Sequence, residues 1–422
     1  MGLLCHILIL AIGFTLVASA PEKPPVKKSY RGHKIYKALP GTRDQAELIN
    51  RLEVLEHLGV DVWRRPKTPG QEVTLSVSPR ARGNVERFFK QHAIPYSIVI
   101  HDLQSMIDSS YESTEATSYA FSLTQYNRHD DINDWLDSTA SSCGSRCSIE
   151  NIGTSTNGRT LKVIKIGKSS SSNSKAIWVD AGIHAREWIS PAASLYLIDK
   201  LVNSYNSDST VRSLVDAFDW YILPSSNPDG YEYSYVYDRL WRKTRSRNSG
   251  SSCFGADPNR NWDYKWMLTG ASSNPCSDTY AGSIAFSEPE TTAMKDFMLS
   301  KSSSLNMYIS IHAYGQYILT PWGYTEDLPS DYNDLEYVGN EGAAGIRGVN
   351  GRSFTVGSST RVLYAAAGAS DDWAKAVAGI KYSYTLELRD TGYWGFVLPV
   401  SQITPACEET YAGIVRMAQA IM

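Results

Sequence analysis

Short apolar segments alternate with helical segments from residue 119 to the C-terminus of this 422-residue chain. Most of these segments are apolar throughout, so we expect strands that are buried on both faces. Strands that alternate with helices form a largely parallel sheet, because the helices are the crossovers. The sequence therefore predicts an α/β fold with one large, mixed, mostly parallel twisted sheet and helices on both faces. The expected strands are Leu161–Ile166, Ala176–Asp180, Trp220–Leu223, Asn306–Ile311 and Lys381–Leu388.

Two features of this region carry more detailed predictions. We expect the first two of these strands to be adjacent, with a helix at Pro191–Asn203 after the second. The Ser-Glu-Pro-Glu sequence at 287–290 has the composition of a capping box with proline in the first turn, and predicts a helix that ends near Lys301. Ligands of open α/β sheets bind beyond the carboxyl ends of the strands, where we expect the functional site.

The first 20 residues have the composition of a secretory signal peptide. An apolar run from Leu3 to Val17 precedes the small residues Ala18-Ser19-Ala20, although no Lys or Arg precedes the run. The alternative is a membrane anchor, but the run is shorter than the roughly 20 residues that span a bilayer. We therefore expect cleavage after residue 20 and a secreted, extracellular protein.

The segment after the signal reads as a small α+β unit. Its strands and helices follow the order β-α-β-β-α-β, which is typical of a small open sandwich. A polar stretch at 109–118 follows it and is the expected linker. We therefore expect a signal segment (1–20), a small domain (21–108), a linker (109–118) and a large domain (119–422). The expected elements of the small domain are Gly32–Ala38, Arg43–Leu58, Val60–Trp63, Glu72–Val77, Gly83–His92 and Tyr96–Ile100.

The charge of the chain excludes some partners. Lys and Arg number 41 and Asp and Glu number 44, a net charge of −3, so no bulk basic field attracts nucleic acid or an anionic membrane. An extracellular chain can form disulfides, and loss of Cys5 with the signal leaves five of the six cysteines. Cys143 and Cys147 could form a local bridge, which the sequence alone does not prove.

Two histidines and a glutamate follow expected strands. His184 and Glu187 lie just beyond one strand, and His312 follows another. Two His and one Glu, with a fourth position open to water, make the ligand set of a catalytic zinc site. Taken singly, each histidine is more often an ordinary core or surface residue, and one His-x-x-Glu pair is a weak signal. The chain contains neither HExxH nor GxSxG, which argues against zincin proteases and α/β-hydrolases.

One carboxylate and several cationic or amide groups are further candidates. Glu387 alternates with leucines in an apolar strand, where an unpaired carboxylate is costly. Its functional interpretation is a general base that acts on water, and the alternative is a buried ion pair with an arginine. Arg242, Asn259 and Arg260 lie near aromatic residues and offer donors that match a carboxylate, the alternative being simple surface solvation.

In combination these residues resemble the metallocarboxypeptidases of the carboxypeptidase A/B family in their zymogen form. The resemblance covers the chain from about residue 32 to the C-terminus. It implies that His184, Glu187 and His312 bind one Zn²⁺, that Glu387 is the general base and that Arg242 polarises the scissile carbonyl. The implied activity is hydrolysis of the C-terminal peptide bond by zinc-activated water.

The same resemblance implies how substrate is held. A clamp on the terminal carboxylate would consist of Asn259, Arg260 and Tyr364, with subsite residues at Arg186 and Tyr314. The resemblance further implies that Asp257 orients a zinc-bound histidine. It also implies cis peptide bonds that precede Tyr314, Trp322 and Asp390.

Several partners follow from the resemblance. It implies peptide or protein C-termini as substrate, an activating protease and protein inhibitors as partners, no membrane or nucleic acid, and a monomer. A digestive lumen is one extracellular location that fits. The small domain would be an activation propeptide that covers the mouth of the active site.

Asp371 determines the expected specificity. In this family an Asp in the floor of the terminal side-chain pocket favours Lys and Arg, whereas aliphatic residues favour apolar or aromatic termini. Asp371 matches that floor position, which predicts a B-type enzyme; the alternative is that it is the N-cap of an ordinary helix. Ser359, Leu363 and Gly323 match other lining positions and could narrow or reshape the pocket.

Two further expectations concern the pairing of the cysteines and the site of activation cleavage. The resemblance implies a disulfide between Cys253 and Cys276, which leaves Cys407 as a buried small hydrophobe. Family zymogens are commonly activated by trypsin-like cuts at the linker, but no Lys or Arg occurs between Lys90 and Arg128, so trypsin cannot cut there. Either a protease of another class cuts near residues 109–118, or trypsin cuts upstream, at Lys90 or before.

Two alternative functions stay open. One is an A-type carboxypeptidase that prefers aliphatic or aromatic termini. The other is an inactive, peptide-binding relative, which would lack the base or a metal ligand.

Overall fold

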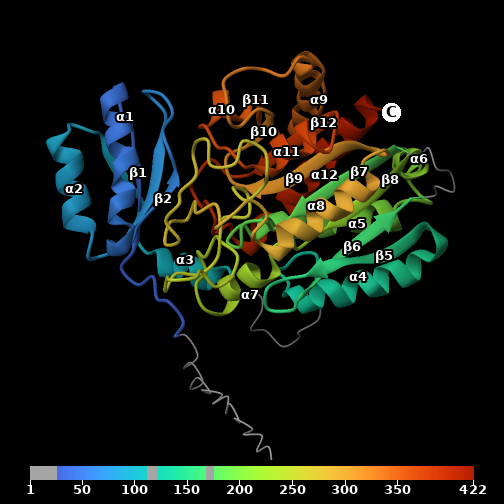
Figure 1. Ribbon diagram of the computed structural model, residues 1–422, viewed down its shortest axis with the longest axis horizontal. Helices are drawn as coiled ribbons and strands as arrows, with labels where there is room; N and C mark the ends of the chain where they lie inside the picture. Colours follow the sequence, from blue (N-terminus) through green and yellow to red (C-terminus); the bar gives the residue numbers. More distant parts are fainter. Residues whose placement is uncertain (1–25, 112–120, 168–174) are drawn as a thin grey trace, which may run out of the picture.

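The computed structural model describes residues 26–111, 121–167 and 175–422, which form a small N-terminal domain beside a large domain (Figure 1). The expected signal segment and most of the expected linker lie outside the described residues. The small domain consists of β1 (Lys34–Ala38), α1 (Arg43–Asn50), η1 (Arg51–Leu58), β2 (Val60–Arg64), β3 (Val73–Val77), α2 (Arg82–Gln91), β4 (Tyr96–Ile100) and α3 (Leu103–Ser109).

The small domain is an antiparallel sheet covered by helices. Its strands pair in the order β2-β3-β1-β4, and α1 and α2 lie on the side away from the large domain (Figure 1). The predicted order of strands and helices is therefore confirmed.

The predicted helix at 43–58 is wrong in its second half. The Thr42 hydroxyl accepts from the Gln45 amide and forms a capping box, so the α-helix begins as expected, but it ends at Asn50. The chain continues as the 3₁₀-helix η1, which rises about 2.0 Å per residue rather than about 1.5 Å. This tighter form carries the chain further per residue toward Gly59 and β2.

The large domain is built on an eight-stranded mixed sheet. The strands are β5 (Cys147–Thr154), β6 (Thr160–Ile166), β7 (Lys175–Ala181), β8 (Phe218–Leu223), β9 (Leu305–Ala313), β10 (Tyr317–Thr320), β11 (Thr355–Ser358) and β12 (Tyr382–Leu388). They lie in the order β11-β10-β12-β9-β7-β8-β6-β5. The four central strands β12, β9, β7 and β8 are mutually parallel, while β6, β5 and β10 supply the antiparallel pairs.

The expected adjacency of the strands at 161–166 and 176–180 is wrong, because β8 lies between β6 and β7. Every residue of β8 is buried, which suits a central position. In β6 the half-buried Lys162 and Lys165 alternate with apolar residues, which suits a strand near the edge. The second edge of β6 pairs antiparallel with β8, which separates β6 from β7.

Helices cover both faces of this sheet (Figure 1). One face packs against α4 (His129–Cys143), α5 (Ile189–Asn203), α6 (Ser209–Ala217), α9 (Tyr332–Asn350) and α12 (Ile403–Ala420). The other packs against α8 (Pro289–Lys301) and α11 (Ser370–Ala376). The shorter helices are η2 (Gly144–Arg146), α7 (Pro228–Val236), α10 (Ser359–Val362) and η3 (Val400–Gln402). The predicted fold class is confirmed. No helix among the described residues has the length and apolar character needed to cross a bilayer.

The predicted capping box at 287–290 is wrong, although its helix is present as α8. Glu288 is the N-cap residue and makes no side-chain cap, and the Ser287 hydroxyl donates to the Glu288 carboxylate at 2.8 Å. The Glu288 amide donates instead to Oδ1 of Asn261 at 3.2 Å, so a distant side chain has replaced the local cap.

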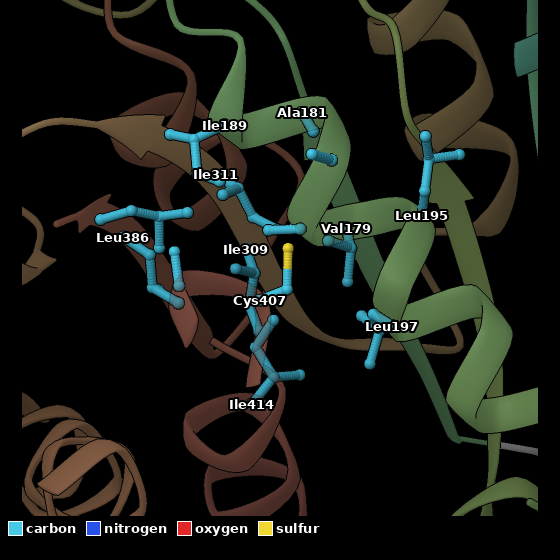
Figure 2. Close-up of a cluster of buried hydrophobic side chains, with 14 of the residues drawn as sticks. Val179, Ala181, Ile189, Leu195, Leu197, Ile309, Ile311, Leu386, Cys407 and Ile414 are labelled. Carbon is cyan, nitrogen blue, oxygen red and sulfur yellow. The ribbon is translucent and has the colours of Figure 1, made fainter. Parts of the chain in front are cut away.

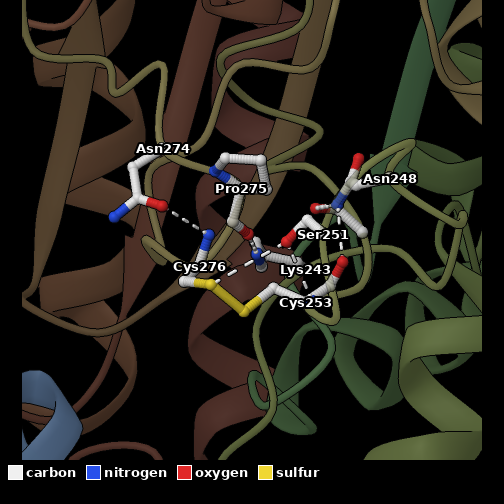
Figure 3. The surroundings of a disulfide bond; sticks show 8 residues. Lys243, Asn248, Ser251, Cys253, Asn274, Pro275 and Cys276 are labelled. Atoms are coloured by element: carbon white, nitrogen blue, oxygen red, sulfur yellow. Dashed lines mark hydrogen bonds between the residues drawn. A yellow bond between two sulfur atoms is a disulfide. The ribbon is translucent and has the colours of Figure 1, made fainter.

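Two disulfides and three cis peptide bonds hold the loops of the large domain. Cys143 is joined to Cys147, and Cys253 to Cys276. Figure 3 shows the second bridge, beside which the Lys243 ammonium donates to the carbonyl of Pro275 at 2.6 Å. The cis bonds are Ala313-Tyr314, Pro321-Trp322 and Arg389-Asp390.

Cys407 is a reduced cysteine buried in the main core. It lies on α12 among the apolar side chains of β7, β9 and β12, including Ile309, Ile311 and Leu386 (Figure 2). Burial raises the pKa of its thiol well above the usual value, so the thiolate is strongly disfavoured. The prediction that Cys407 is a small hydrophobe is confirmed.

We predict that Cys407→Ser destabilises the protein by about 1–3 kcal/mol, because it buries a hydroxyl among apolar side chains. Cys407→Ala, which adds no polar atom, should cost less. Urea or thermal unfolding of the two variants and the wild type measures both effects. Equal stability of Cys407→Ser and wild type would contradict the apolar environment described above.

Candidate functional site

The expected metal ligands meet at the carboxyl edge of the central sheet. His184 and Glu187 lie in the loop that joins β7 to α5, and His312 lies near the end of β9. Because β7 and β9 are parallel neighbours, their carboxyl ends lie together. The Glu187 carboxylate lies between the histidines, with Oε1 2.7 Å from Nδ1 of His184 and Oε2 3.1 Å from Nδ1 of His312. All three side chains are buried.

The hydrogen-bonding capacity of these groups fits a bound cation. His184 places Nδ1 against Glu187 and Nε2 3.1 Å from Oδ1 of Asp257. A neutral imidazole carries one N–H, so one of these contacts lacks a proton and joins two acceptors. Burial lowers the pKa of His184, which disfavours a second proton. A cation between the imidazole and Glu187 removes this conflict, and Nε2 of His312 is buried without a hydrogen-bond partner.

The chemistry of the donor set favours zinc. Two imidazole nitrogens and one carboxylate form a set that Zn²⁺ accepts, with a further position for water or substrate. Their ligand atoms all lie within 4.8 Å of one another. Among the described residues, no other group of three or more His, Cys, Asp or Glu side chains is arranged in this way.

Glu387 faces this group from β12. Its register partner across the parallel pair is His312, and its partner on the antiparallel side is Tyr317. Loss of solvent raises the pKa of Glu387 to about 8, an effect that His312 and Arg242 oppose. The carboxyl group is therefore a proton acceptor whose affinity for a proton is far above that of an exposed glutamate.

Asp257 makes hydrogen bonds to both His184 and Arg242. Its Oδ1 accepts from His184, and its Oδ2 accepts from Nη2 of Arg242 at 2.8 Å and from Nε of Arg242 at 3.2 Å. Asp257 is fully buried, and although burial opposes ionisation, Arg242 and His184 hold its pKa well below the usual value. One ionised carboxylate thus orients both His184 and Arg242.

The remaining candidates lie around one cavity of about 110 Å³. Asn259 accepts from the Ser370 amide with its Oδ1, which leaves its Nδ2 to donate elsewhere. Arg260 donates through Nε to the Gly270 carbonyl and through Nη1 to the Asn259 carbonyl. The cavity brings together the predicted groups His184, Glu187, Arg242, Asn259, Arg260, His312, Tyr314, Tyr364, Asp371 and Glu387.

Asp371 lies in this cavity and is not an N-cap. The N-cap of α11 is Ala369, and Asp371 is the second residue of the helix. Its side chain is buried, and burial raises its pKa. The neighbouring Asp372 has a different task, because its carboxylate accepts from the Gly323 amide at 2.9 Å and holds the loop that forms the cavity wall.

Arg186 lies apart from the other predicted groups, in a second pocket. Its Nη1 is 3.0 Å from Asp61 of the small domain and 3.4 Å from Asp278 of the large domain. The two pockets share the lining residues Trp63, Arg65, Arg242 and Tyr364, so they are neighbours.

Several residues at the site had not been predicted. Thr385 lies two residues before Glu387 on the same strand, and strand alternation could have identified it. Trp63, Arg64 and Arg65 of the small domain line the central cavity, and no local pattern in the sequence indicates this. Phe396 stacks its edge on Tyr314, with ring centroids 5.0 Å apart.

The small domain closes the mouth of the cavity. Asp61 accepts from the Trp63 indole at 2.8 Å while it pairs with Arg186. Arg64 donates to the Tyr317 hydroxyl beside Glu387. A second contact joins the Lys28 ammonium to Asp238 at 3.0 Å.

Comparisons with known proteins agree with this geometry. The zinc carboxypeptidase family matches residues 132–413, and the carboxypeptidase activation peptide family matches residues 36–110. Carboxypeptidase A2 of Mus musculus is 38% identical over 393 residues, which cover 92% of this chain and 93% of the relative. Carboxypeptidase B of Astacus astacus is 45% identical over 292 residues, which cover 69% of this chain and 95% of the relative.

Solved structures are similar over almost the whole chain. The crystal structure of thrombin activatable fibrinolysis inhibitor superposes with a TM-score of 0.84 at 33% identity, and covers 92% of this chain and 98% of that one. Both domains are therefore shared with proteins of known class. The chain belongs to the zinc carboxypeptidase family and carries a carboxypeptidase activation peptide at its N-terminus.

Proposed function

We propose that this zinc carboxypeptidase zymogen, after release of its activation peptide, removes Lys or Arg from the C-termini of secreted or dietary peptides. The observation that carries the preference is the buried carboxylate of Asp371 inside the cavity. Among the described residues, no lysine or arginine is a main electrostatic neighbour of this carboxylate. A cationic terminal side chain would supply the missing partner, whereas an apolar one would leave the carboxylate buried and unpaired.

In this proposal each residue has a defined task. His184, Glu187 and His312 hold the zinc ion, which when bound supplies an electrophile that acidifies water and polarises the substrate carbonyl. Glu387 accepts the proton of the attacking water and passes it to the leaving amine. Arg242 donates to the oxygen on which negative charge develops, and Asp257 keeps both Arg242 and His184 in position.

A separate set of residues restricts cleavage to the last residue of the substrate. Asn259, Arg260 and Tyr364, which line the same cavity as Arg242, bind the free terminal carboxylate. A peptide without a free C-terminus cannot satisfy these donors. Arg186 and Tyr314 would contact substrate residues that precede the scissile bond.

The activation peptide blocks the entry of substrate into this cavity. Trp63, Arg64 and Arg65 occupy the mouth of the cavity, and the pair of Asp61 with Arg186 holds this edge of the small domain in place. We further propose that residues 1–20 direct secretion, that 21–108 is the activation peptide and that cleavage in 109–118 separates it from the enzyme at 119–422. Zymogens of this design need an activating protease.

Substitution of Glu387 by Gln should abolish turnover but not zinc binding. The amide keeps the shape of the side chain and cannot accept the proton, so kcat should fall by about 10²–10⁴-fold. Kinetics of the activated enzyme and its zinc content by mass spectrometry measure the two effects. Glu336→Gln, on the surface helix α9, is a matched control and should be silent. A kcat within tenfold of wild type in Glu387→Gln would refute the assignment of the base.

Substitution of Asp371 by Ile should convert the preference. The wild-type enzyme should cleave a peptide that ends in Arg or Lys faster than the same peptide that ends in Phe, and Asp371→Ile should reverse this order. Asp371→Asn keeps the shape and removes the charge, so it should lose the basic preference without gaining a strong aromatic one. The measurement is kcat/KM for matched peptides. A wild-type preference for Phe would favour the A-type alternative.

Trypsin should not produce an N-terminus between residues 92 and 128. No Lys or Arg occurs at 91–127, so trypsin finds no side chain to bind there. N-terminal sequencing or mass mapping of digested zymogen tests this. The control Glu115→Arg adds a basic residue to the linker and should be cut after it. A trypsin-dependent N-terminus within this range in the wild type would show that the expectation is wrong.

A further inference from the structure

Asp238 is a largely buried carboxylate of the large domain that binds two side chains of the small domain. It lies just after α7, and its Oδ2 accepts from the Lys28 ammonium at 3.0 Å. Its Oδ1 accepts from the Tyr30 hydroxyl and, at 3.2 Å, from the Leu240 amide. The Lys28 amide also donates to the carbonyl of Tyr237 at 2.7 Å. A short segment of the small domain is therefore bound here by its backbone, a cation and a hydroxyl.

Release of the activation peptide would take the Lys28 ammonium and the Tyr30 hydroxyl away from Asp238. Of the three donors described above, only the Leu240 amide belongs to the large domain. Arg245 lines the same cavity as Asp238, but its guanidinium is stacked on Tyr233, with Cζ 3.6 Å from the ring centroid. A largely buried carboxylate that has lost its cation is costly, so a new cation would bind there favourably.

Asp238 lies along the series of cavities between the two domains that begins at the catalytic groups. The pocket around Arg186 shares lining residues with the catalytic cavity. A third cavity of about 600 Å³ shares Asp61 and Asp278 with the Arg186 pocket, and Asp238 lies in its wall. Nη1 of Arg186 is also 3.4 Å from the carbonyl of Leu240, two residues after Asp238. Asp238 is therefore close to the group that would contact the substrate before the scissile bond.

We propose that Asp238 binds a basic side chain of the substrate, several residues before the scissile bond, in the place that Lys28 occupies in the zymogen. This inference rests on the proposed function, because the activation peptide must first leave. It adds a second preference for Lys or Arg, away from the terminal residue. Asp238 is a specificity residue that takes no part in the proton transfers.

The test uses matched peptides that all end in Arg. One Lys is moved stepwise through the positions before the scissile bond, with Ala elsewhere, and an all-Ala peptide is the reference. For the activated wild-type enzyme, kcat/KM should be about three- to fivefold above the reference when Lys is at the position that reaches Asp238, the effect of a partly exposed ion pair. The gain should shrink in high salt, which screens such a pair.

Two variants and a matched control assign this gain to Asp238. Asp238→Asn keeps the shape and removes the charge, so the gain, measured against the all-Ala peptide in the same variant, should disappear. Asp238→Lys reverses the charge and should favour Glu over Lys at that position. Asp296→Asn, on α8 where the carboxylate is exposed and pairs with Lys295 at 2.8 Å, should keep the wild-type gain. The wild-type series and its salt dependence still test the inference if a variant fails to fold.

The outcomes separate this inference from the proposed function. Equal kcat/KM for the all-Ala peptide and every Lys-containing peptide in the wild type would overturn the inference and leave the proposed function intact. A gain that persists in Asp238→Asn would also overturn it, because the cation would then bind elsewhere. A wild-type preference for a terminal Phe over Arg would overturn the proposed specificity. The same Lys series on peptides that end in Phe would then still decide whether Asp238 binds a basic side chain.

Discussion

The parallel pairing of β9 with β7 on one side and with β12 on the other is the constraint on which the rest of the site depends. It brings the carboxyl ends of three strands to one edge, so that His312 at the end of β9 lies between the loop after β7 and Glu387 on β12. A shift of β12 by one residue would turn Glu387 to the opposite face of the sheet. The register is set by apolar residues of the strands and of α12, which pack on one face of the sheet. The apolar core therefore determines the geometry of the polar site.

The site holds several charged side chains away from solvent, and the negative charge of Asp257 offsets the positive charge of Arg242. Without Asp257 the largely buried guanidinium of Arg242 would lose the carboxylate that accepts its hydrogen bonds, at a cost of several kcal/mol. With Asp257 in place, Arg242 and His184 are held by opposite oxygens of one rigid carboxylate. Groups that are fixed in this way need little reorganisation when charge develops on a substrate, which is the main source of electrostatic catalysis. Structural stability and catalytic competence thus depend on the same contacts.

Much of this could be predicted from the sequence because parallel sheets obey simple rules. The apolar strands before His184 and His312 were sufficient to place both residues at one edge, and the alternation around Glu387 was sufficient to place it on a polar face. Patterns of polarity do not encode the order of strands, however, and the neighbourhood of β6 and β7 was therefore predicted wrongly. The capping box at Ser287 failed for a similar reason, because a long-range contact from Asn261 replaced the local one.

The contacts of the small domain were beyond such rules, because nothing in the sequence near Trp63 indicates which surface that edge strand meets. Those contacts place an aromatic ring and several charged groups at the mouth of the cavity. Burial lowers the pKa of Arg65, and the neighbouring Arg260 and Arg242 lower it further, while Tyr364 and Asp278 raise it.

Ion pairs attach the small domain where Asp61 meets Arg186 and Lys28 meets Asp238, and Trp63 also packs against aromatic rings of the large domain. Partly exposed ion pairs are individually weak, and the linker strengthens them because it keeps the two domains at a high local concentration. If the linker is cleaved as proposed, these contacts lose the high local concentration that the covalent link provides, which favours release of the small domain from the cavity.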